Sequence, residues 1–434
     1  MQTAFLIIYT IFYFIALLAL LPHEYFKRPK AIRNRWIREK FGFFKKSFPN
    51  FILSNKRKRV WIHAISVGEV IGVTTLVKKL SEKYDVILST ITDTGQSVAM
   101  QRFRELPVNI IYLPFDTPCA VLRTIKFFKP SALILVETEI WANLISLSAR
   151  KFPVIIVNGR LSKKSFKGYK KIKFFIKPLL NKISMLCVQD ETYKNHFLAL
   201  GAEEKKIHVT GNLKFDIELK VIPFEWEKFI PKPVIIAGST HETEEELILK
   251  TFLEINTAGT LIIAPRHPER FDEVEKLIGS TIINTSQNIT FKRLRDIERD
   301  LESSPSKIPD LKEGSKFILL IDKIGILGSL YRIADIAIVG GSFIPHGGQN
   351  PLEPAYWKKA IVCGPSMHNF PFIEEFIREK ACLSTDRENL KITLQNLIEN
   401  REFRNSFGEK AYDIFLKKSG GTTRTLKLLE SILP

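Results

Sequence analysis

The chain begins with an uninterrupted apolar stretch. Residues 1–22 carry no charged side chain, and a run of Lys and Arg follows directly. Residues 3–21 have about the length that an α-helix needs to cross a bilayer. A cleaved signal peptide carries positive charge before its apolar run and a small-residue cleavage site after it, and this segment has neither. Because basic flanks stay in the cytoplasm, the pattern predicts a single-pass anchor with a cytoplasmic body. A buried core helix is the alternative.

From Val60 onward, short apolar runs alternate with longer mixed segments, which is typical of parallel α/β units. The first series of predicted strands comprises residues 60–65, 85–90, 109–113, 132–137, 154–158, 185–189 and 208–211. The second series follows a proline-rich linker near residues 223–233 and comprises residues 234–237, 260–264, 281–284, 317–321, 336–339 and 360–363. We expect helices between the strands and over 401–433, and a long polar insertion or loop over 286–315.

These elements predict an α/β protein with two Rossmann-like, doubly wound domains, a cleft between them and an N-terminal membrane-anchor helix. A length of 434 residues agrees with two domains after the anchor. The predicted bounds are 1–24 for the anchor, 25–220 and 221–400 for the two domains, and 401–434 for a helical segment that packs back toward the N-terminal domain.

The excess positive charge is concentrated in two segments of the N-terminal half. The net charge is +19, but residues 21–60 hold 13 basic and two acidic residues, and residues 150–182 hold 11 basic and no acidic residue. Both segments contain aromatic residues, and a basic side chain near an anionic leaflet contributes about 1 kcal/mol. We therefore predict a membrane-facing surface, with a solvated basic face as the alternative. Its lysines are Lys163, Lys164, Lys167, Lys170 and Lys171.

Polar residues just after the predicted strands are the first candidates for chemistry, because ligands of open α/β sheets bind beyond the carboxyl ends of the strands. Glu69 follows Ser66-Val67-Gly68 and is either a capping-box partner of Ser66 or a general base. Glu137 ends the fourth predicted strand. Two carboxylates in one cleft disfavour each other's ionisation unless a cation lies between them, and Lys214 is the candidate cation. A structural ion pair of Glu137 with Lys214 is the alternative.

The second half carries signals for a phosphate group. Arg266 follows a buried strand, and Gly325 is expected to open a short helix. Residues 347–353 (GGQNPLE) predict a glycine loop that enters a helix, with Asn350 as the N-cap and Pro351 at the first helical position. Backbone amides at such a position bind phosphate, and a carboxylate in the first turn accepts hydrogen bonds from ribose hydroxyls. A capped helix without a ligand is the alternative.

Metal and disulfide chemistry are not predicted. The four cysteines are scattered without a CxxC pair, and the eight histidines show no metal-ligand spacing. There is no D-x-D, Walker A or GxGxxG motif. We therefore predict no metal and no cofactor.

Five motifs, in this order, resemble the Kdo transferases, the lipid A-modifying glycosyltransferases of Gram-negative bacteria with the two-domain GT-B fold. The resemblance runs from the N-terminal segment to the C-terminal helix. The motifs are His63-Ala64-Ile65-Ser66-Val67-Gly68-Glu69, Val136-Glu137-Thr138-Glu139-Ile140-Trp141, Gly211-Asn212-Leu213-Lys214-Phe215-Asp216, Pro265-Arg266-His267-Pro268-Glu269-Arg270-Phe271, and Gly340-Gly341-Ser342 through Gly347-Gly348-Gln349-Asn350-Pro351-Leu352-Glu353.

The resemblance implies transfer of 3-deoxy-D-manno-octulosonic acid (Kdo) from CMP-Kdo to a 6′-hydroxyl of a tetraacylated lipid A precursor (lipid IVA), with inversion at the anomeric carbon. It implies Glu69 as general base, with Glu137 and Lys214 supporting the transition state. The family often has His where this chain has Gln349, and residues 286–315 carry no landmark of the family. The positions implied to contact CMP are Pro265, Arg266, Ile324, Gly325, Ile326, Gly347, Gly348, Gln349, Asn350 and Glu353.

The implied partners are CMP-Kdo, an anionic glycolipid acceptor and the cytoplasmic face of the bacterial inner membrane, and no nucleic acid. CMP leaves with a single phosphate and needs less help from a metal than a diphosphate, which agrees with the missing D-x-D motif. The sequence leaves two rival functions open. One is another GT-B enzyme that uses a UDP-sugar and a lipid acceptor. The other is a membrane-tethered nucleic-acid-binding protein, whose binding would depend steeply on salt.

Overall fold

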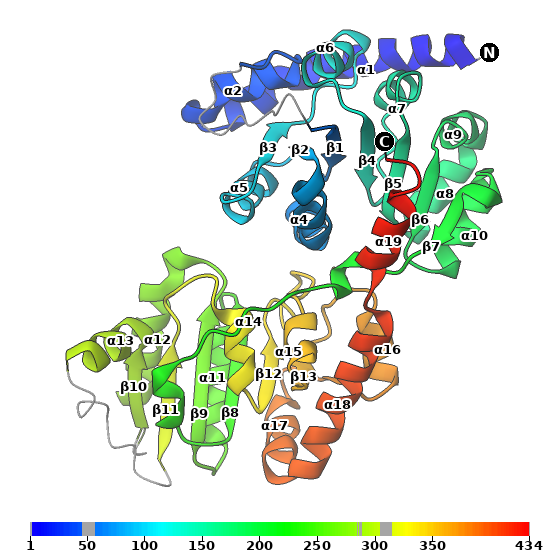
Figure 1. The fold of residues 1–434 in the computed structure, drawn as a ribbon. Helices are drawn as coiled ribbons and strands as arrows, with labels where there is room; N and C mark the ends of the chain where they lie inside the picture. Colours follow the sequence, from blue (N-terminus) through cyan, green and yellow to red (C-terminus); the bar gives the residue numbers. More distant parts are fainter. Residues whose placement is uncertain (1, 46–56, 284, 286–288, 304–314, 434) are drawn as a thin grey trace. The chain divides into compact units, whose positions relative to one another are not determined.

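The computed structural model describes the chain except for residues 1, 46–56, 284, 286–288, 304–314 and 434. The chain forms two compact units. Unit 1 comprises Met1–Asp216 and Lys418–Pro434, and unit 2 comprises Ile217–Lys417. Each unit is built around one seven-stranded parallel sheet with helices on its faces (Figure 1).

Unit 1 has the strand order β3-β2-β1-β4-β5-β6-β7. Its strands are β1 (Arg59–His63), β2 (Asp85–Thr90), β3 (Val108–Tyr112), β4 (Ala132–Val136), β5 (Val154–Gly159), β6 (Met185–Val188) and β7 (Ile207–Val209). Its helices are α1 (Gln2–Lys27), α2 (Lys30–Lys40), α3 (Val67–Gly72), α4 (Thr74–Lys83), α5 (Asp93–Arg102), α6 (Pro118–Phe128), α7 (Ala142–Ser148), α8 (Lys163–Lys171), α9 (Lys173–Leu180), α10 (Glu191–Leu200) and α19 (Gly421–Leu429), with short 3₁₀ turns η1 (Glu204–Lys206) and η2 (Leu213–Phe215).

Unit 2 has the strand order β10-β11-β9-β8-β12-β13-β14. Its strands are β8 (Val234–Thr240), β9 (Gly259–Pro265), β10 (Ile289–Arg293), β11 (Lys316–Leu320), β12 (Ile336–Val339), β13 (Ala360–Cys363) and β14 (Cys382–Ser384). Its helices are α11 (Glu244–Glu254), α12 (Phe271–Ile283), α13 (Leu294–Ser303), α14 (Leu327–Leu330), α15 (Leu352–Tyr356), α16 (Ile373–Arg378), α17 (Leu390–Glu399) and α18 (Arg401–Lys418), with 3₁₀ turns η3 (Glu225–Lys228), η4 (Pro268–Arg270) and η6 (Tyr331–Ile333).

Both sheets are buried on both faces, which is why their central strands are continuous apolar runs. In β1, Trp61 packs into the core on one face and Ile62 into the core on the other. Leu429 of α19 joins the same core as Ile62, so the last helix of the chain covers one face of the sheet in unit 1. The strand order reverses between β1 and β4 in unit 1, and between β8 and β12 in unit 2. These two switch points are where ligands of doubly wound sheets bind.

The predicted doubly wound α/β fold is confirmed, but the predictions for residues 281–315 are wrong. No strand forms at 281–283, because Phe271, Val274 and Ile278 recur at helical spacing and carry α12 on to Ile283. The described part of the polar segment 286–315 forms β10 and α13 rather than a loop; residues 286–288 and 304–314 lie outside the described residues. β10 pairs only with β11, so as an edge strand it is half-buried and lacks an apolar run.

The C-terminal segment is helical as predicted, and its two helices belong to different units. α18 lies in unit 2 and α19 lies in unit 1. The sequence instead predicts that residues 401–434 form one segment. The predicted cleft between the domains stays a prediction.

Helix α1 contains Ala4–Lys27, the one span in the described residues that is long and apolar enough to cross a membrane. None of its most apolar window is buried, which excludes the buried core helix. By length and composition α1 is a candidate membrane segment.

Asp216 fastens α19 to unit 1, since its carboxylate accepts hydrogen bonds from the backbone N–H groups of Gly420 (2.6 Å) and Thr422. We predict that Asp216→Ala, which leaves these donors unpaired, lowers the free energy of local opening of α19 by about 1–3 kcal/mol. Hydrogen exchange of residues 421–429 measures this change. Asp413→Ala, an exposed site on α18, is the control and leaves that exchange rate unchanged. Equal protection in both variants would contradict the prediction.

Candidate active site

The candidate residues of unit 1 meet at its switch point. Glu69 lies in α3 just after β1, and Glu137 directly follows β4. These two strands are hydrogen-bonded neighbours, with His63 paired to Leu135. Because both strands run in the same direction, the residues that follow them share one edge of the sheet.

The Glu69 carboxylate is held by the turn that precedes α3. Oε2 accepts a hydrogen bond from the Ile65 N–H at 2.8 Å, and Oε1 accepts one from the Ser66 hydroxyl at 3.2 Å. The capping-box interpretation is thus right in kind but shifted by one residue, since the backbone donor is Ile65 rather than Ser66. Glu69 is 9% exposed. Burial, and then the nearby Glu137 carboxylate, raise the pKa of Glu69 to about 7.

Glu137 is the charged centre of this edge. Its backbone is left-handed, with φ at 59°, which is unusual for a residue with a side chain. Arg160 Nε donates a hydrogen bond of 2.6 Å to Glu137 Oε2, and Lys214 Nζ lies 3.5 Å from Oε1. Arg160 directly follows β5, so the rule that polar residues after strands carry chemistry would have identified it, but it is not among the residues predicted from the sequence.

Lys214 reaches Glu137 across two glycines of α3. A Cβ at Gly72 would lie 3.2 Å from Lys214 Cγ, and one at Gly68 would lie 4.0 Å from Nζ. The Asn212 side chain accepts the Lys214 N–H at 3.0 Å and fixes the short 3₁₀ turn that carries the lysine. The structure therefore brings Glu69, Glu137 and Lys214 together within unit 1.

Glu139 adds a third carboxylate, which is not among the predicted site residues although it belongs to the Glu-Thr-Glu motif. Burial, and then the Glu69 charge, raise the pKa of Glu139 to about 8. The Glu137 carboxylate forms ion pairs with Arg160 and Lys214. Glu69 and Glu139 beside it have raised pKa values. The edge of unit 1 can therefore accept a proton near neutral pH, as general-base chemistry requires.

The candidate residues of unit 2 lie at the switch point between β8 and β12 and around it. His241 follows β8, Arg266 follows β9, and Gly341 lies just beyond β12. The buried Glu244 organises this edge, since its carboxylate accepts the N–H groups of His241 (3.0 Å), Gly341 (2.7 Å) and Phe343 (3.0 Å). Arg266 is exposed at the edge, and its N–H is donated to the Thr240 carbonyl.

The glycine loop at residues 347–350 packs against this edge. Gly347 and Gly348 have φ values of 98° and 77°, and a Cβ at Gly348 would lie 2.1 Å from Met367 Sδ, so neither position suits a side chain. Gln349 Nε2 lies 3.1 Å from His241 Nε2, which puts an imidazole beside the position where the family often has His. The Asn350 side chain accepts a hydrogen bond from the Leu352 N–H at 3.1 Å. Because α15 begins at Leu352 with Pro351 in the N-cap position, the predictions of Asn350 as the N-cap and of Pro351 as the first helical residue are both wrong by one residue.

The remaining predicted residues lie along α14 and α15. Ile324 is exposed, Gly325 has φ at 92°, and Ile326 is buried just before α14. A Cβ at Gly328 of α14 would lie 3.5 Å from a carboxylate oxygen of Glu353, so Glu353 lies beside α14.

Three histidine rings gather beside the glycine loop. The ring centroid of His241 lies 4.2 Å from that of His346 and 5.4 Å from that of His267. Burial, and then the nearby His346, lower the pKa of His241 to about 4, so its ring is neutral at pH 7. In the part of the chain that the structure describes, no group of three or more His, Cys, Asp or Glu residues is arranged to hold a metal ion. The absence of a metal and a cofactor stays a prediction.

Comparison with known proteins identifies the family. The chain is 32% identical to the 3-deoxy-D-manno-octulosonic acid transferase of Haemophilus influenzae, over 86% of this chain and 87% of the relative. It belongs to the 3-deoxy-D-manno-octulosonic acid transferase family. The family profile described as "3-Deoxy-D-manno-octulosonic-acid transferase (kdotransferase)" matches residues 35–217, and the transferase of Rickettsia felis is 32% identical over 83% of this chain and 75% of its own. The protein is therefore a glycosyltransferase.

A solved structure supports the fold of this Kdo transferase family member. UDP-GlcNAc 2-epimerase from Neisseria meningitidis aligns with a TM-score of 0.54 and 14% identity, over 86% of this chain and 100% of its own. At that identity the likeness concerns the fold alone, which is of the GT-B type.

We predict that the Glu69 carboxyl titrates near pH 7 and that Glu137→Gln lowers its pKa. The substitution removes a repelling negative charge and leaves Lys214 and Arg160 free to attract the Glu69 carboxylate. A ¹³C NMR titration of labelled glutamate measures both values, with Glu69→Gln identifying the signal. Glu82 is an exposed residue on α4, and Glu82→Gln is the matched control that leaves the pKa of Glu69 unchanged. A Glu69 pKa close to the ordinary value of 4.5 in the wild type would contradict the prediction.

Proposed function

We propose that the protein transfers Kdo from CMP-Kdo to the 6′-hydroxyl of a tetraacylated lipid A precursor, lipid IVA, with inversion at the anomeric carbon. Membership of the family supports the sugar that is transferred. The observation that carries the mechanism is the carboxylate edge of unit 1, where Glu69 has a pKa of about 7 beside the paired Glu137.

In this proposal Glu69 is the general base. It takes the proton from the acceptor hydroxyl while the hydroxyl oxygen forms a bond to the anomeric carbon. The bond from that carbon to the phosphate oxygen breaks, and CMP leaves with the electron pair. The Ile65 N–H and the Ser66 hydroxyl hold the Glu69 carboxylate in place for this step.

Glu137, Arg160 and Lys214 form the support for the transition state. A carboxylate paired with two cations keeps a fixed arrangement of charge, and prearranged charge stabilises a transition state without the cost of reorganisation. Lys214 contacts Glu137 without a short hydrogen bond, since their charged atoms are 3.5 Å apart. Its ammonium therefore retains donors for a substrate carboxylate or phosphate.

The edge of unit 2 is proposed to bind CMP. The Arg266 guanidinium attracts the phosphate, the amides of the glycine loop are positioned by Gly347 and Gly348, and Glu353 accepts hydrogen bonds from ribose hydroxyls. The full set proposed to contact CMP is Pro265, Arg266, Ile324, Gly325, Ile326, Gly347, Gly348, Gln349, Asn350 and Glu353. The neutral His241 beside Gln349 gives this loop an imidazole even though position 349 lacks one.

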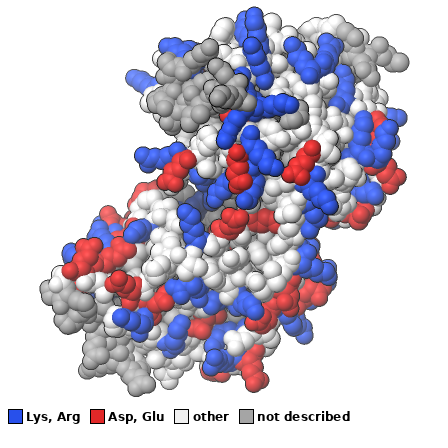
Figure 2. Space-filling model, viewed as in Figure 1, with Lys and Arg blue, Asp and Glu red and all other residues white. Residues whose placement is uncertain are grey.

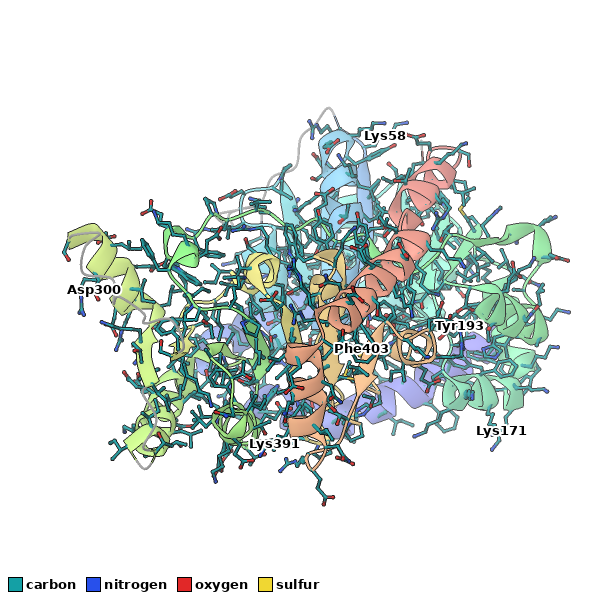
Figure 3. The ribbon with its side chains drawn as sticks, turned by 90° about the horizontal axis from the view of Figure 1, so that it is seen from below. Lys58, Lys171, Tyr193, Asp300, Lys391 and Phe403 are labelled. Atoms are coloured by element: carbon teal, nitrogen blue, oxygen red, sulfur yellow. The ribbon has the colours of Figure 1, made fainter. Side chains whose placement is uncertain are left out.

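The proposed location is the cytoplasmic face of the bacterial inner membrane, with α1 as the attachment. The lysines of α8 are all exposed, and Figure 3 shows Lys171 at the periphery of the ribbon. Lys and Arg predominate on the face of unit 1 seen in Figure 2, whereas both signs are interspersed on unit 2. A basic surface beside an apolar helix suits an anionic, acylated acceptor.

We predict that Glu69→Ala lowers the rate of Kdo transfer by about 10²–10⁴-fold, because a positioned general base contributes that much. The assay is transfer from CMP-Kdo to purified lipid IVA in detergent, with products resolved by mass and CMP binding measured in parallel. In the wild type the rate rises with pH through about 7, since only the deprotonated carboxylate accepts the proton. Glu82→Ala serves as the control and keeps the wild-type rate.

Three results would count against this proposal. Full activity in Glu69→Ala would return Glu69 to a purely structural role in its turn. Absence of product from folded wild-type protein would point to another donor. Stronger competition by UDP than by CMP would favour a transferase that uses a UDP-sugar.

We predict that neutralising the α8 lysines raises the apparent KM for the lipid acceptor more than the KM for CMP-Kdo, because the acceptor is the membrane-bound anion. The substitutions, to Gln, are at Lys163, Lys164, Lys167, Lys170 and Lys171. Five exposed lysines of unit 2 provide a control with the same change in net charge: Lys276, Lys380, Lys391, Lys410 and Lys417. An equal rise in both KM values would refute the assignment of α8 to the acceptor side.

A further inference from the structure

Helix α1 packs along the body of unit 1 instead of projecting from it. Near its start, the Phe5 ring lies 5.1 Å from Phe174 and 5.8 Å from Phe175, both in α9. Near its end, Tyr25 packs against the cluster of Trp36 and Phe115. Figure 1 shows α1 (dark blue) lying across α7.

The contacts of α1 include polar ones in its apolar part. The Tyr9 hydroxyl donates a hydrogen bond of 2.7 Å to Asp116 Oδ2, and Thr10 and Asn143 are joined side chain to side chain at 3.0 Å. The same Asp116 carboxylate accepts the backbone N–H of Asn143 (3.1 Å) and of Leu144 (2.7 Å) at the start of α7. The apolar first half of α1 is therefore hydrogen-bonded to a buried carboxylate of the folded domain.

These contacts conflict with a membrane-spanning orientation. If α1 crossed the bilayer in this arrangement, it would carry Asp116, Asn143 and the start of α7 into the hydrocarbon. A carboxylate at the centre of a bilayer costs at least about 2.5 kcal/mol, and the irregular backbone before α7 would lose contact with water. If instead α1 left the domain in order to span, it would leave the buried Asp116 without Tyr9.

The two ends of α1 also lie next to basic segments. At the end near Phe5, Phe174 follows Lys173 and the lysines of α8. At the other end, α2 begins at Lys30 and carries Arg33. Since basic segments stay on the cytoplasmic side, both ends of α1 belong on the same side of the membrane.

The opposite face of α1 is apolar and exposed. A helix of 26 residues is about 39 Å long, so this face forms a long apolar strip. Phe174 of α9, 61% exposed, lies at one end of it. The strip consists of Ile7, Ile8, Ile11, Phe12, Phe14, Ile15 and Leu18.

We propose that α1 does not cross the bilayer but lies in the plane of its cytoplasmic leaflet, with one face on unit 1 and the other in the acyl region. The occupant of the apolar strip is an anionic lipid leaflet, because exposed lysines flank the strip at both ends: Lys27 and Lys30 at one end, and Lys173 with the lysines of α8 at the other. This inference rests on the proposed attachment to a membrane and replaces the predicted single-pass anchor with an in-plane one. It also fixes which side of unit 1 faces the lipid.

Three positions on the exposed face, spaced seven residues apart, test the orientation. Ala4, Ile11 and Leu18 are each replaced by Cys in a full-length Cys119→Ser protein, since Cys119 is the exposed native cysteine among the described residues. Each cysteine is spin-labelled, and its immersion depth is measured by EPR power saturation in vesicles of phosphatidylethanolamine and phosphatidylglycerol. Seven residues of helix rise by about 10 Å, so a spanning helix separates the depths clearly.

We expect equal, shallow depths at all three positions. A label at Ile11 that is about 10 Å deeper than those at Ala4 and Leu18 would show a spanning helix and overturn the inference. Labels that stay in water at all three positions would overturn the attachment itself. Lys391→Cys on unit 2, an exposed site, provides the reference for a label in water.

Kdo transfer in detergent is measured for each labelled protein. This assay shows that the variants are folded, and it separates the catalytic proposal from the orientation of α1. If the protein transfers Kdo in detergent but its labels show a spanning helix, the in-plane orientation is wrong and the catalytic proposal stands. If the three labels are equally shallow but the protein does not transfer Kdo, the orientation stands and the catalytic proposal is wrong.

Discussion

The pairing of Glu137 with two cations is the interaction on which the chemistry of unit 1 depends. A buried carboxylate is costly unless it is paired and hydrogen-bonded, and Arg160 and Lys214 provide this pairing from two different segments. Burial, and then the nearby Glu137 carboxylate, raise the pKa of Glu69 beside it. Glu137 thus joins the segments that follow β4, β5 and β7, and its carboxylate contributes to the raised pKa of Glu69.

Unit 2 also contains a buried carboxylate, Glu244, whose hydrogen-bond donors are uncharged. Glu244 is also buried, but its carboxylate is satisfied by three backbone N–H groups rather than by cations. Those bonds hold the turn after β8 and the residues beyond β12, against which the glycine loop packs. Both sheets are parallel and seven-stranded, although β11 lies between β10 and β9 in unit 2 and unit 1 has no counterpart of this insertion. The different partners of a single buried carboxylate give the edge of unit 1 an acid–base character and the edge of unit 2 a backbone-lined character suited to a nucleotide.

The N-terminal helix shows how tertiary contacts change the meaning of an apolar stretch. Length and hydropathy alone favour a spanning anchor. The hydrogen bond from Tyr9 to Asp116 and the aromatic contacts with α9 bind the first part of the helix to unit 1, and Tyr25 packs against the cluster of Trp36 and Phe115 near its end. These contacts place the apolar strip and the lysines of α8 on one unit, where a lipid acceptor would meet them.

The sequence by itself determined the parallel α/β fold, because strands buried on both faces must be apolar runs. It also predicted that Glu69, Glu137 and Lys214 lie together, because polar residues that follow such runs share one edge of the sheet; their catalytic roles stay a prediction. The sequence did not predict β10, because this half-buried edge strand lacks an apolar run. It predicted a strand over residues 281–284, although α12 extends through Ile283. Only the tertiary structure decided that Arg160 pairs with Glu137, that Glu139 joins the same edge, and that α1 lies against Asp116. Those contacts join segments far apart in the chain, and their energies depend on burial, which no local pattern of residues records.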